Sequence, residues 1–247
     1  MSTTRKTLAP PPITVKGVYK EMPITIYGEY HDNINNTFYK KLNLKDAIVL
    51  VEHSTKFCQL QPDEEHLFAN AKGSEYIWFT RTKHNQPVVC IDTRLEQGFL
   101  NRFEETLLQH GETVTLEALL MKTRQIIMAT LTVKDNFLPI KELYTKLIEE
   151  TKIQFKQMMV NVKTGERDEP LIEHLIANLL MLSNLSVDMT ILKKLDEYAA
   201  ADNRDEIIIF VGANHAERLK EFLGLKGGKK LKRKSKKKTK KIKKNYI

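Results

Sequence analysis

The chain is poor in cysteine, with only Cys58 and Cys90 among its 247 residues. Metal centres built from thiolates need several cysteines or histidines at short, characteristic spacings, and these two cysteines have no such spacing. The sequence therefore excludes a cysteine-based metal site. We predict that both cysteines are reduced, structural thiols of an intracellular protein.

The sequence also lacks a long apolar run. No stretch approaches the roughly 20 apolar residues that a membrane-spanning helix needs. Residues 1–12 are polar and proline-rich and lack the apolar segment of a secretory signal. These absences predict a protein without a transmembrane segment that is not secreted and remains intracellular, in the cytoplasm or the nucleus. The hydrophobic fraction of 41% is sufficient for a sizeable core.

Acidic residues are missing from the C-terminal segment, residues 226–247. This segment carries 13 of the 40 Lys and Arg and none of the 31 Asp and Glu, so residues 1–225 hold 27 basic against 31 acidic residues. The net charge of +9 is therefore concentrated in this tail. Because the tail has almost nothing apolar to bury, we predict that it is disordered. It can bind nucleic acid or another polyanion nonspecifically, or act only as a solubilising tail.

Short apolar, β-branched runs alternate with helical patterns, and this alternation predicts an α/β fold. Strands are expected at residues 13–20, 24–27, 47–52, 88–94 and 207–211. Helices are expected from Asp32 or Asn33 to about Leu42, from Pro62 to about Ala71, and from residue 213 to about Leu223. Residues 98–201 show leucine and isoleucine at helical spacing, with few strand signals.

From this order we predict a mostly parallel central sheet with flanking helices and a helical insertion between the third and last core strands. Residues 1–12 form a disordered lead, and residues 13–225 form a single α/β domain with the insertion at about 98–201. The Lys-rich tail completes the chain.

Two copies of the pattern Gly-x-x-His lie near opposite ends of the domain, at Gly28/His31 and Gly212/His215. Each copy follows an expected strand, where glycine permits a tight turn into a helix. Because ligands bind at the carboxyl ends of strands in such sheets, we expect the two histidines to meet in one crevice. A helix N-terminus disfavours the imidazolium form, so both histidines are expected to be neutral.

Charged residues at further strand ends extend this candidate site. Glu52 ends one expected strand, and with His31 and His215 it can bind Zn²⁺, Mn²⁺ or Fe²⁺. Arg94 ends another and can bind an anionic group or a developing oxyanion. Glu29 is a secondary candidate for proton transfer. Each signal is weak alone, and their conjunction carries the prediction.

Two nearby residues receive simpler interpretations. His53 follows Glu52 on the same strand, so it is expected to point the opposite way and not to bind a ligand. Trp78 is expected to pack in the core.

The order Gly28/His31, Glu52, Arg94, Gly212/His215 resembles the Tiki/TraB superfamily, which includes erythromycin-esterase-like and ChaN-like haem-uptake proteins. The segment Gly28-Glu29-Tyr30-His31-Asp32-Asn33 looks most like the ChaN-like branch. The resemblance spans about residues 22–223. It implies an α/β sheet with helical insertions, a site where the two histidine turns meet, and activities from metal-dependent proteolysis to ester hydrolysis to haem binding.

Three hypotheses follow. The first is a metal-assisted hydrolase of ester or peptide bonds, acting on a small-molecule or peptide substrate. The second is a non-enzymatic binder of haem or a similar tetrapyrrole, with Tyr30, His31 or His215 as iron ligands. The third is a polyanion-associated protein that acts through its tail and whose α/β site is vestigial.

Overall fold

The computed structural model describes residues 10–30, 34–59, 71–92, 94, 138–164, 168–201 and 205–225. Several predictions fall outside these residues: the position of His31, the helix at 62–71, the first part of the helical insertion, and the structure of the N-terminal lead and the Lys-rich tail.

The described residues form a five-stranded sheet with the strand order β1-β2-β5-β3-β4. The strands are β1 (Ile13–Tyr19), β2 (Met22–Glu29), β3 (Ile48–Ser54), β4 (Val88–Asp92) and β5 (Ile207–Gly212). Only β1, at one edge, pairs antiparallel, and the other pairings are parallel. The prediction of a mostly parallel α/β sheet is therefore confirmed.

The strand register brings the ends of β2, β5 and β3 together. Glu29 pairs with Gly212 across β2 and β5, and Val51 pairs with Phe210 across β3 and β5. Toward β4 the register of β3 shifts, because Val51 pairs with Cys90 but Ser54 pairs with Asp92. The extra residue makes a β-bulge, a feature often found beside functional sites.

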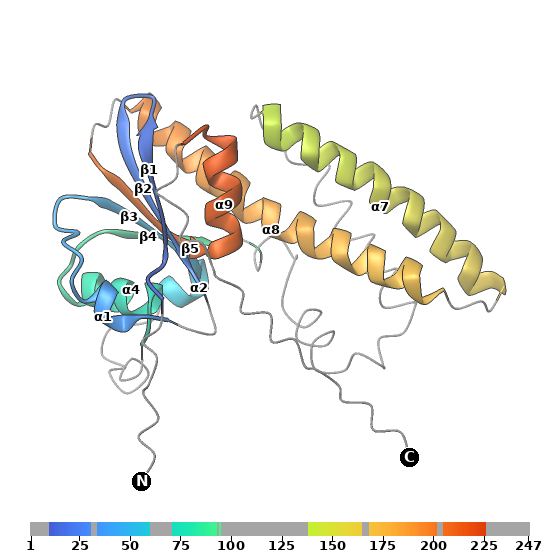
Figure 1. The fold of residues 1–247 in the computed structure, drawn as a ribbon, viewed down its shortest axis with the longest axis horizontal. Helices are drawn as coiled ribbons and strands as arrows, with labels where there is room; N and C mark the ends of the chain where they lie inside the picture. The colour runs from blue at the N-terminus through green and yellow to red at the C-terminus, as the bar shows by residue number, and fades with distance from the viewer. Residues whose placement is uncertain are drawn as a thin grey trace, which may run out of the picture.

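Helices cover both faces of this sheet (Figure 1). They are α1 (Asn36–Tyr39), α2 (Thr55–Cys58), α4 (Ser74–Lys83), α7 (Leu138–Thr164), α8 (Glu169–Ala200) and α9 (Ala213–Phe222). The predicted helix up to Leu42 was too long, because α1 ends at Tyr39. Its N-cap is Asn35, whose side chain accepts a hydrogen bond from the backbone N–H of Phe38. Such a cap fixes the helix start at this residue.

Apolar side chains fill both faces of the sheet, as expected for buried parallel strands. One core contains Ile24, Ile26 and Ile209 together with residues of α8 and α9. The other contains Tyr27, Phe210 and residues of α1 and α4, including the buried Trp78. All six residues of β5 are buried, which explains why this strand reads as a continuous apolar run.

Gly28 serves a different purpose from the predicted one. It lies inside β2, and a Cβ at this position would come within 2.7 Å of the Ala216 side chain on α9. The glycine therefore provides the space in which α9 approaches the sheet closely, and it does not form a turn.

Helices α7 and α8 form a long hairpin that extends away from the sheet (Figure 1). Among the described residues, α8 alone is long and apolar enough to cross a membrane by length and composition, and 61% of that apolar window is buried inside the protein. Long core helices pass the same test, so the predicted absence of a transmembrane segment stays a prediction.

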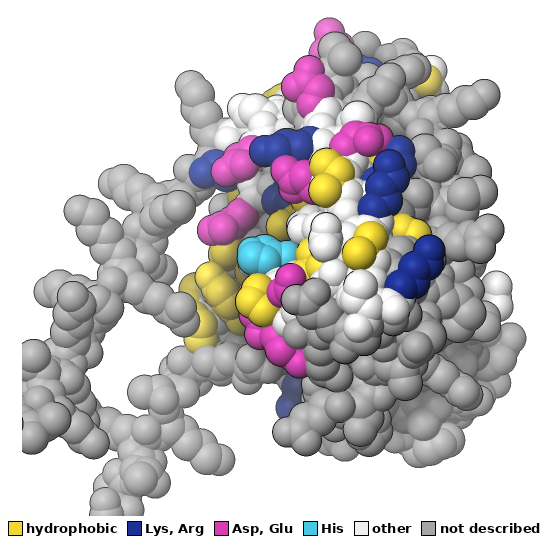
Figure 2. Space-filling model, turned by 90° about the vertical axis from the view of Figure 1, so that its right-hand side faces the viewer, with side chains coloured by type: hydrophobic (Ala, Val, Ile, Leu, Met, Phe, Trp, Pro, Cys, Tyr) yellow, Lys and Arg dark blue, Asp and Glu magenta, His cyan; other side chains and the backbone are white. Residues whose placement is uncertain are grey.

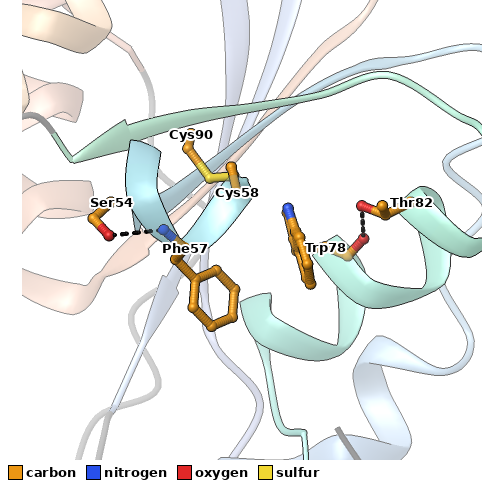
Figure 3. The surroundings of a disulfide bond; sticks show 6 residues. All are labelled: Ser54, Phe57, Cys58, Trp78, Thr82 and Cys90. Carbon is orange, nitrogen blue, oxygen red and sulfur yellow. Dashed lines mark hydrogen bonds between the residues drawn. A yellow bond between two sulfur atoms is a disulfide. The ribbon is translucent and has the colours of Figure 1, made fainter. Parts of the chain in front are cut away.

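Cys58 and Cys90 form a disulfide, with their Cα atoms 6.2 Å apart, so the prediction of two reduced thiols was wrong (Figure 3). Cys58 ends α2 directly after β3, and Cys90 lies in the neighbouring strand β4. The parallel pairing of β3 with β4 thus brings together two cysteines that are distant in sequence. The disulfide lies beside Phe57 and Trp78, whose rings are 4.8 Å apart.

Candidate active site

A pocket of about 280 Å³ lies where β2, β5 and β3 end. Its wall includes the ends of these three strands and the start of α4. The lining residues are Glu29, Ile34, Glu52, His53, Lys72, Ser74, Glu75, Val211 and Gly212. This is the edge of the sheet at which ligands bind in open α/β folds.

His215, in the first turn of α9, lies between two carboxylates. Its Nδ1 is 2.6 Å from Oδ1 of Asp188 on α8, and its Nε2 is 3.3 Å from Oε1 of Glu52. Asp188 is fully buried and His215 is 5% exposed. The histidine thus connects the end of β3 to the middle of α8.

Two arginines complete this network. Arg94 donates to both carboxylate oxygens of Asp92, at 2.8 and 2.7 Å, and also contacts Glu52 at 3.3 Å. Arg218, one turn after His215 on α9, donates to Oδ2 of Asp188. The other carboxylate oxygen of Glu52 accepts from the backbone N–H of Gly212 at 2.6 Å.

This charge network joins three carboxylates, those of Glu52, Asp92 and Asp188, with three cationic groups. Burial of a charge is costly unless it is paired and hydrogen-bonded, and here each charge has such a partner. The network therefore fixes β3, β5, α8 and α9 against one another at the end of the sheet.

The expectation that His215 is neutral is not supported by its surroundings. Although burial lowers its pKa, the hydrogen bonds with Asp188 and Glu52 outweigh burial and raise the pKa of His215 to about 9. For Glu52, burial acts to raise the pKa, but His215, Gly212 and Arg94 lower it to about 2. Two adjacent carboxylates outweigh the helix dipole, whose effect is usually below ~2 kcal/mol.

Glu29 lies on the opposite face of the sheet from this network. It is 5% exposed, and its Oε2 accepts from the Ser74 hydroxyl at 3.1 Å, whereas its Oε1 has no hydrogen-bond partner in the described part of the chain. Burial raises the pKa of Glu29 to about 7, and the side chains of Tyr39 and Ser74 oppose this only in part. A carboxyl group with a pKa near neutrality can both release and accept a proton.

His53 also lines the pocket, on the Glu29 face of the sheet. Its ring stacks on Phe57 with a centroid distance of 4.5 Å, and its Nε2 is a buried atom without a hydrogen-bond partner. Burial lowers the pKa of His53 and outweighs nearby carboxylates such as Glu75, so this imidazole favours its neutral form. Its orientation opposite to Glu52 was expected from strand alternation, but its place in the pocket was not.

Glu52 thus contacts both Arg94 and His215, three residues that the sequence analysis placed in one candidate site, and their role as site residues stays a prediction. Glu29 reaches the same pocket from the other face of the sheet. Tyr30 follows β2 and is 40% exposed, and His31 lies outside the described residues.

Sequence reasoning missed Asp188, Arg218 and Ser74. Asp188 had a usable signal, because it is the only charged residue between Leu175 and Leu192 in an apolar helix. A lone charge in such a run is costly to bury without a partner. Arg218 and Ser74 had no comparable signal.

A metal centre finds little support in the described part of the chain, where no group of three or more His, Cys, Asp or Glu is arranged to hold an ion. Both ring nitrogens of His215 already face carboxylates. The predicted set of His31, Glu52 and His215 stays a prediction.

Comparison with known proteins adds no assignment: no protein-family model, no curated protein and no solved structure matches this chain.

Proposed function

We propose that this protein is a hydrolase of ester or amide bonds, acting in the pocket at the ends of β2, β3 and β5. The observation that carries the proposal is Glu29, a buried carboxyl group that lines the pocket and whose Oε1 accepts no hydrogen bond from the described residues. On the other side of the sheet, the ionised Glu52 is held by His215, Arg94 and Gly212. Two carboxyl groups in one site with opposite pKa shifts are typical of acid–base catalysis.

In the proposed reaction, a water molecule attacks the carbonyl carbon of the substrate while Glu29 accepts one of its protons. Glu29 then delivers this proton to the leaving oxygen or nitrogen as the C–O or C–N bond breaks. The products are a carboxylic acid and an alcohol or amine. Glu52 takes no proton in these steps, because both of its oxygens already have partners, and its network instead fixes the Gly212 edge of the pocket.

The metal-assisted form of this hypothesis and the resemblance to the Tiki/TraB superfamily remain part of the proposal. A divalent ion held by His31, Glu52 and His215 would polarise the carbonyl group or the water. No step above depends on such an ion. Arg94 is proposed as a framework cation, because its guanidinium group contacts Asp92, Glu52 and Asn184.

The test is hydrolysis of ester and amide panels by the purified full chain, with metal content measured on the same sample. Glu29→Gln should lower kcat at least ~100-fold, because it removes the proton-transfer group. Glu75→Gln is the matched control, since Glu75 also lines the pocket but is exposed. Equal turnover by the wild type and Glu29→Gln, or no turnover of either panel, would contradict the proposal.

The two other hypotheses gain no specific support from the described residues. For haem, His215 is enclosed by carboxylates, and Tyr30 is the only described candidate ligand with substantial exposure. For a polyanion, the side from which the α7–α8 hairpin projects shows acidic, basic and hydrophobic side chains interspersed (Figure 2). Nucleic-acid binding through residues 226–247 stays a prediction, and deletion of these residues tests it. The intracellular location also stays a prediction.

A further inference from the structure

Ser74, the first residue of α4, holds both Glu29 and His53. Its hydroxyl and its backbone N–H donate to the Glu29 carboxyl group. Its backbone also hydrogen-bonds the His53 ring, and because the N–H already serves Glu29, the carbonyl oxygen is the group that accepts from His53. We assign this bond to Nδ1–H, because Nε2 has no hydrogen-bond partner among the described residues. In a neutral imidazole, Nε2 is then left with a lone pair and no hydrogen.

Two buried acceptor atoms, Oε1 of Glu29 and Nε2 of His53, belong to side chains that line the same pocket. Neither atom accepts a hydrogen bond from a described residue, although the Tyr39 side chain also interacts with the Glu29 carboxyl group. The missing Cβ at Gly73 leaves room for the Glu29 carboxyl group, since a Cβ there would lie 2.7 Å from Oε1. His53 is fixed by stacking on Phe57. A buried acceptor without a donor is unfavourable, so binding of a ligand that supplies donors is favoured.

We propose that Glu29 Oε1 and His53 Nε2 together bind a nitrogen that carries at least two hydrogens, the NH₂ of a primary carboxamide or the NH₃⁺ of a primary amine. One such nitrogen satisfies both acceptors, whereas an ester oxygen or a tertiary amide satisfies neither. This inference deepens the proposed function and rests on it for its meaning in catalysis, since it names the group that the hydrolase would hold beside its proton-transfer residue.

The experiment measures binding, so that it does not depend on turnover. Acetamide, ethylammonium, N,N-dimethylacetamide and methyl acetate are titrated into the full chain, and the ¹⁵N resonance of His53 Nε2 is followed by NMR. Acetamide, ethylammonium or both should shift this resonance and bind at least ~10-fold more tightly than the two probes without N–H groups. A response to acetamide identifies the ligand group as a primary carboxamide, and a response to ethylammonium identifies it as a primary amine.

His53→Phe keeps an aromatic ring on Phe57 but removes Nε2, and it should weaken binding of the responding probe ~10-fold, as measured by isothermal titration calorimetry on both proteins because the variant lacks the His53 resonance. His84→Phe is the matched control, because His84 is exposed at the end of α4, and it should bind like the wild type. Equal responses to all four probes, no response to any of them, or unchanged binding by His53→Phe would overturn the inference. A bound water would then be enough to satisfy both acceptors. Failed hydrolysis with selective NH₂ binding would contradict the proposed function alone.

Discussion

Asp188 has the most demanding environment of any single residue in the described site. It is fully buried in α8, and its two oxygens serve different partners, Oδ1 facing His215 and Oδ2 accepting from Arg218. Removing one member of such a group leaves the remaining charges buried without compensation, which costs more than the pair itself contributes. The stability of the site therefore depends on this aspartate more than on any one cation.

We expect Asp188→Asn to lower the free energy of unfolding by about 3–5 kcal/mol, because His215 and Arg218 lose their shared negative charge while packing is retained. Urea unfolding monitored by circular dichroism measures the change. Asp196→Asn is the control on the same helix, since the Asp196 side chain is 38% exposed beside Lys20 and should contribute less than ~1 kcal/mol. Similar losses in the two variants would argue against a buried charge network.

Gly73 allows a second test at the residue scale, directed at Glu29. Gly73→Ala places a methyl group about 2.7 Å from Glu29 Oε1, at a residue with a φ of +57°. Gly224→Ala has a similar φ of +62° but nothing within 4 Å, so it measures a positive-φ cost of about 1–2 kcal/mol without a contact, whereas the ψ of −127° at Gly73 adds a backbone cost of its own. We expect Gly73→Ala to be clearly less stable than Gly224→Ala in thermal unfolding and to lose hydrolysis as Glu29 is displaced. Equal stability of the two variants would mean that the carboxyl group moves freely.

At the scale of elements, the sequence predicted the strands better than the helices. Runs such as residues 207–211 are apolar because both faces of β5 are buried. A short stretch of sequence is therefore enough to predict such a strand. Helix α4 was not foreseen, since Tyr76, Ile77, Trp78 and Phe79 are adjacent and do not follow helical spacing. Its burial depends on packing against β3 and β4, which no local pattern records.

The disulfide escaped prediction for a similar reason. Cys58 and Cys90 meet only because β3 and β4 pair in parallel, and the sequence does not specify which strands become neighbours. Glu52, Arg94 and His215 lie close together because carboxyl ends of parallel strands share one edge, whichever strands are adjacent. The sequence did not predict that Glu29 and Glu52 lie on opposite faces of the sheet. That placement depends on how β2, β5 and β3 are aligned with one another.

The cross-link between α2 and β4 leads to a prediction for these elements. It closes a loop with a sequence separation of 32, for which chain entropy gives about 3–4 kcal/mol. A reducing agent should therefore lower the urea midpoint of the wild type. The double variant Cys58→Ser/Cys90→Ser should be less stable from the start and insensitive to the reductant. A wild-type midpoint that does not respond to reductant, with two free thiols by mass spectrometry, would contradict the disulfide.

At the scale of the whole molecule, the sheet separates two kinds of polar environment. The α8–α9 face carries a charge-balanced network, in which each ionised group is held by its partners. The α1–α4 face carries two acceptors that lack donors among the described residues. Under the proposals made above, the first face provides rigidity and the second binds the ligand, with Glu52 and Gly212 where the two meet at the pocket.

The same division determines how stability should vary with pH. Glu29 has a folded pKa of about 7 against 4.5, so its contribution is present below pH 4.5 and is lost as the pH rises to 7. His215 has a folded pKa of about 9 against 6.5, so its contribution is lost between pH 6.5 and 9. Glu52 has a lowered pKa of about 2, and its contribution is lost as the pH falls from 4.5 to 2.

Together these three groups should make a contribution to the free energy of unfolding that is greatest near pH 4.5–5 and declines continuously toward pH 9, and His53 opposes it below pH 6.5 because its lowered pKa disfavours protonation in the folded state. Urea unfolding at intervals from pH 3 to 9 measures this curve. Glu29→Gln removes one titrating group, so it should flatten the decline between pH 4.5 and 7 and leave the decline from pH 7 to 9, which belongs to His215. A stability that rises between pH 5 and 9 would show that these burial and pairing effects do not govern the fold. If the pH dependence of Glu29→Gln runs parallel to that of the wild type, Glu29 does not have a raised pKa in the folded protein. The proposed hydrolysis would then lose its proton-transfer group.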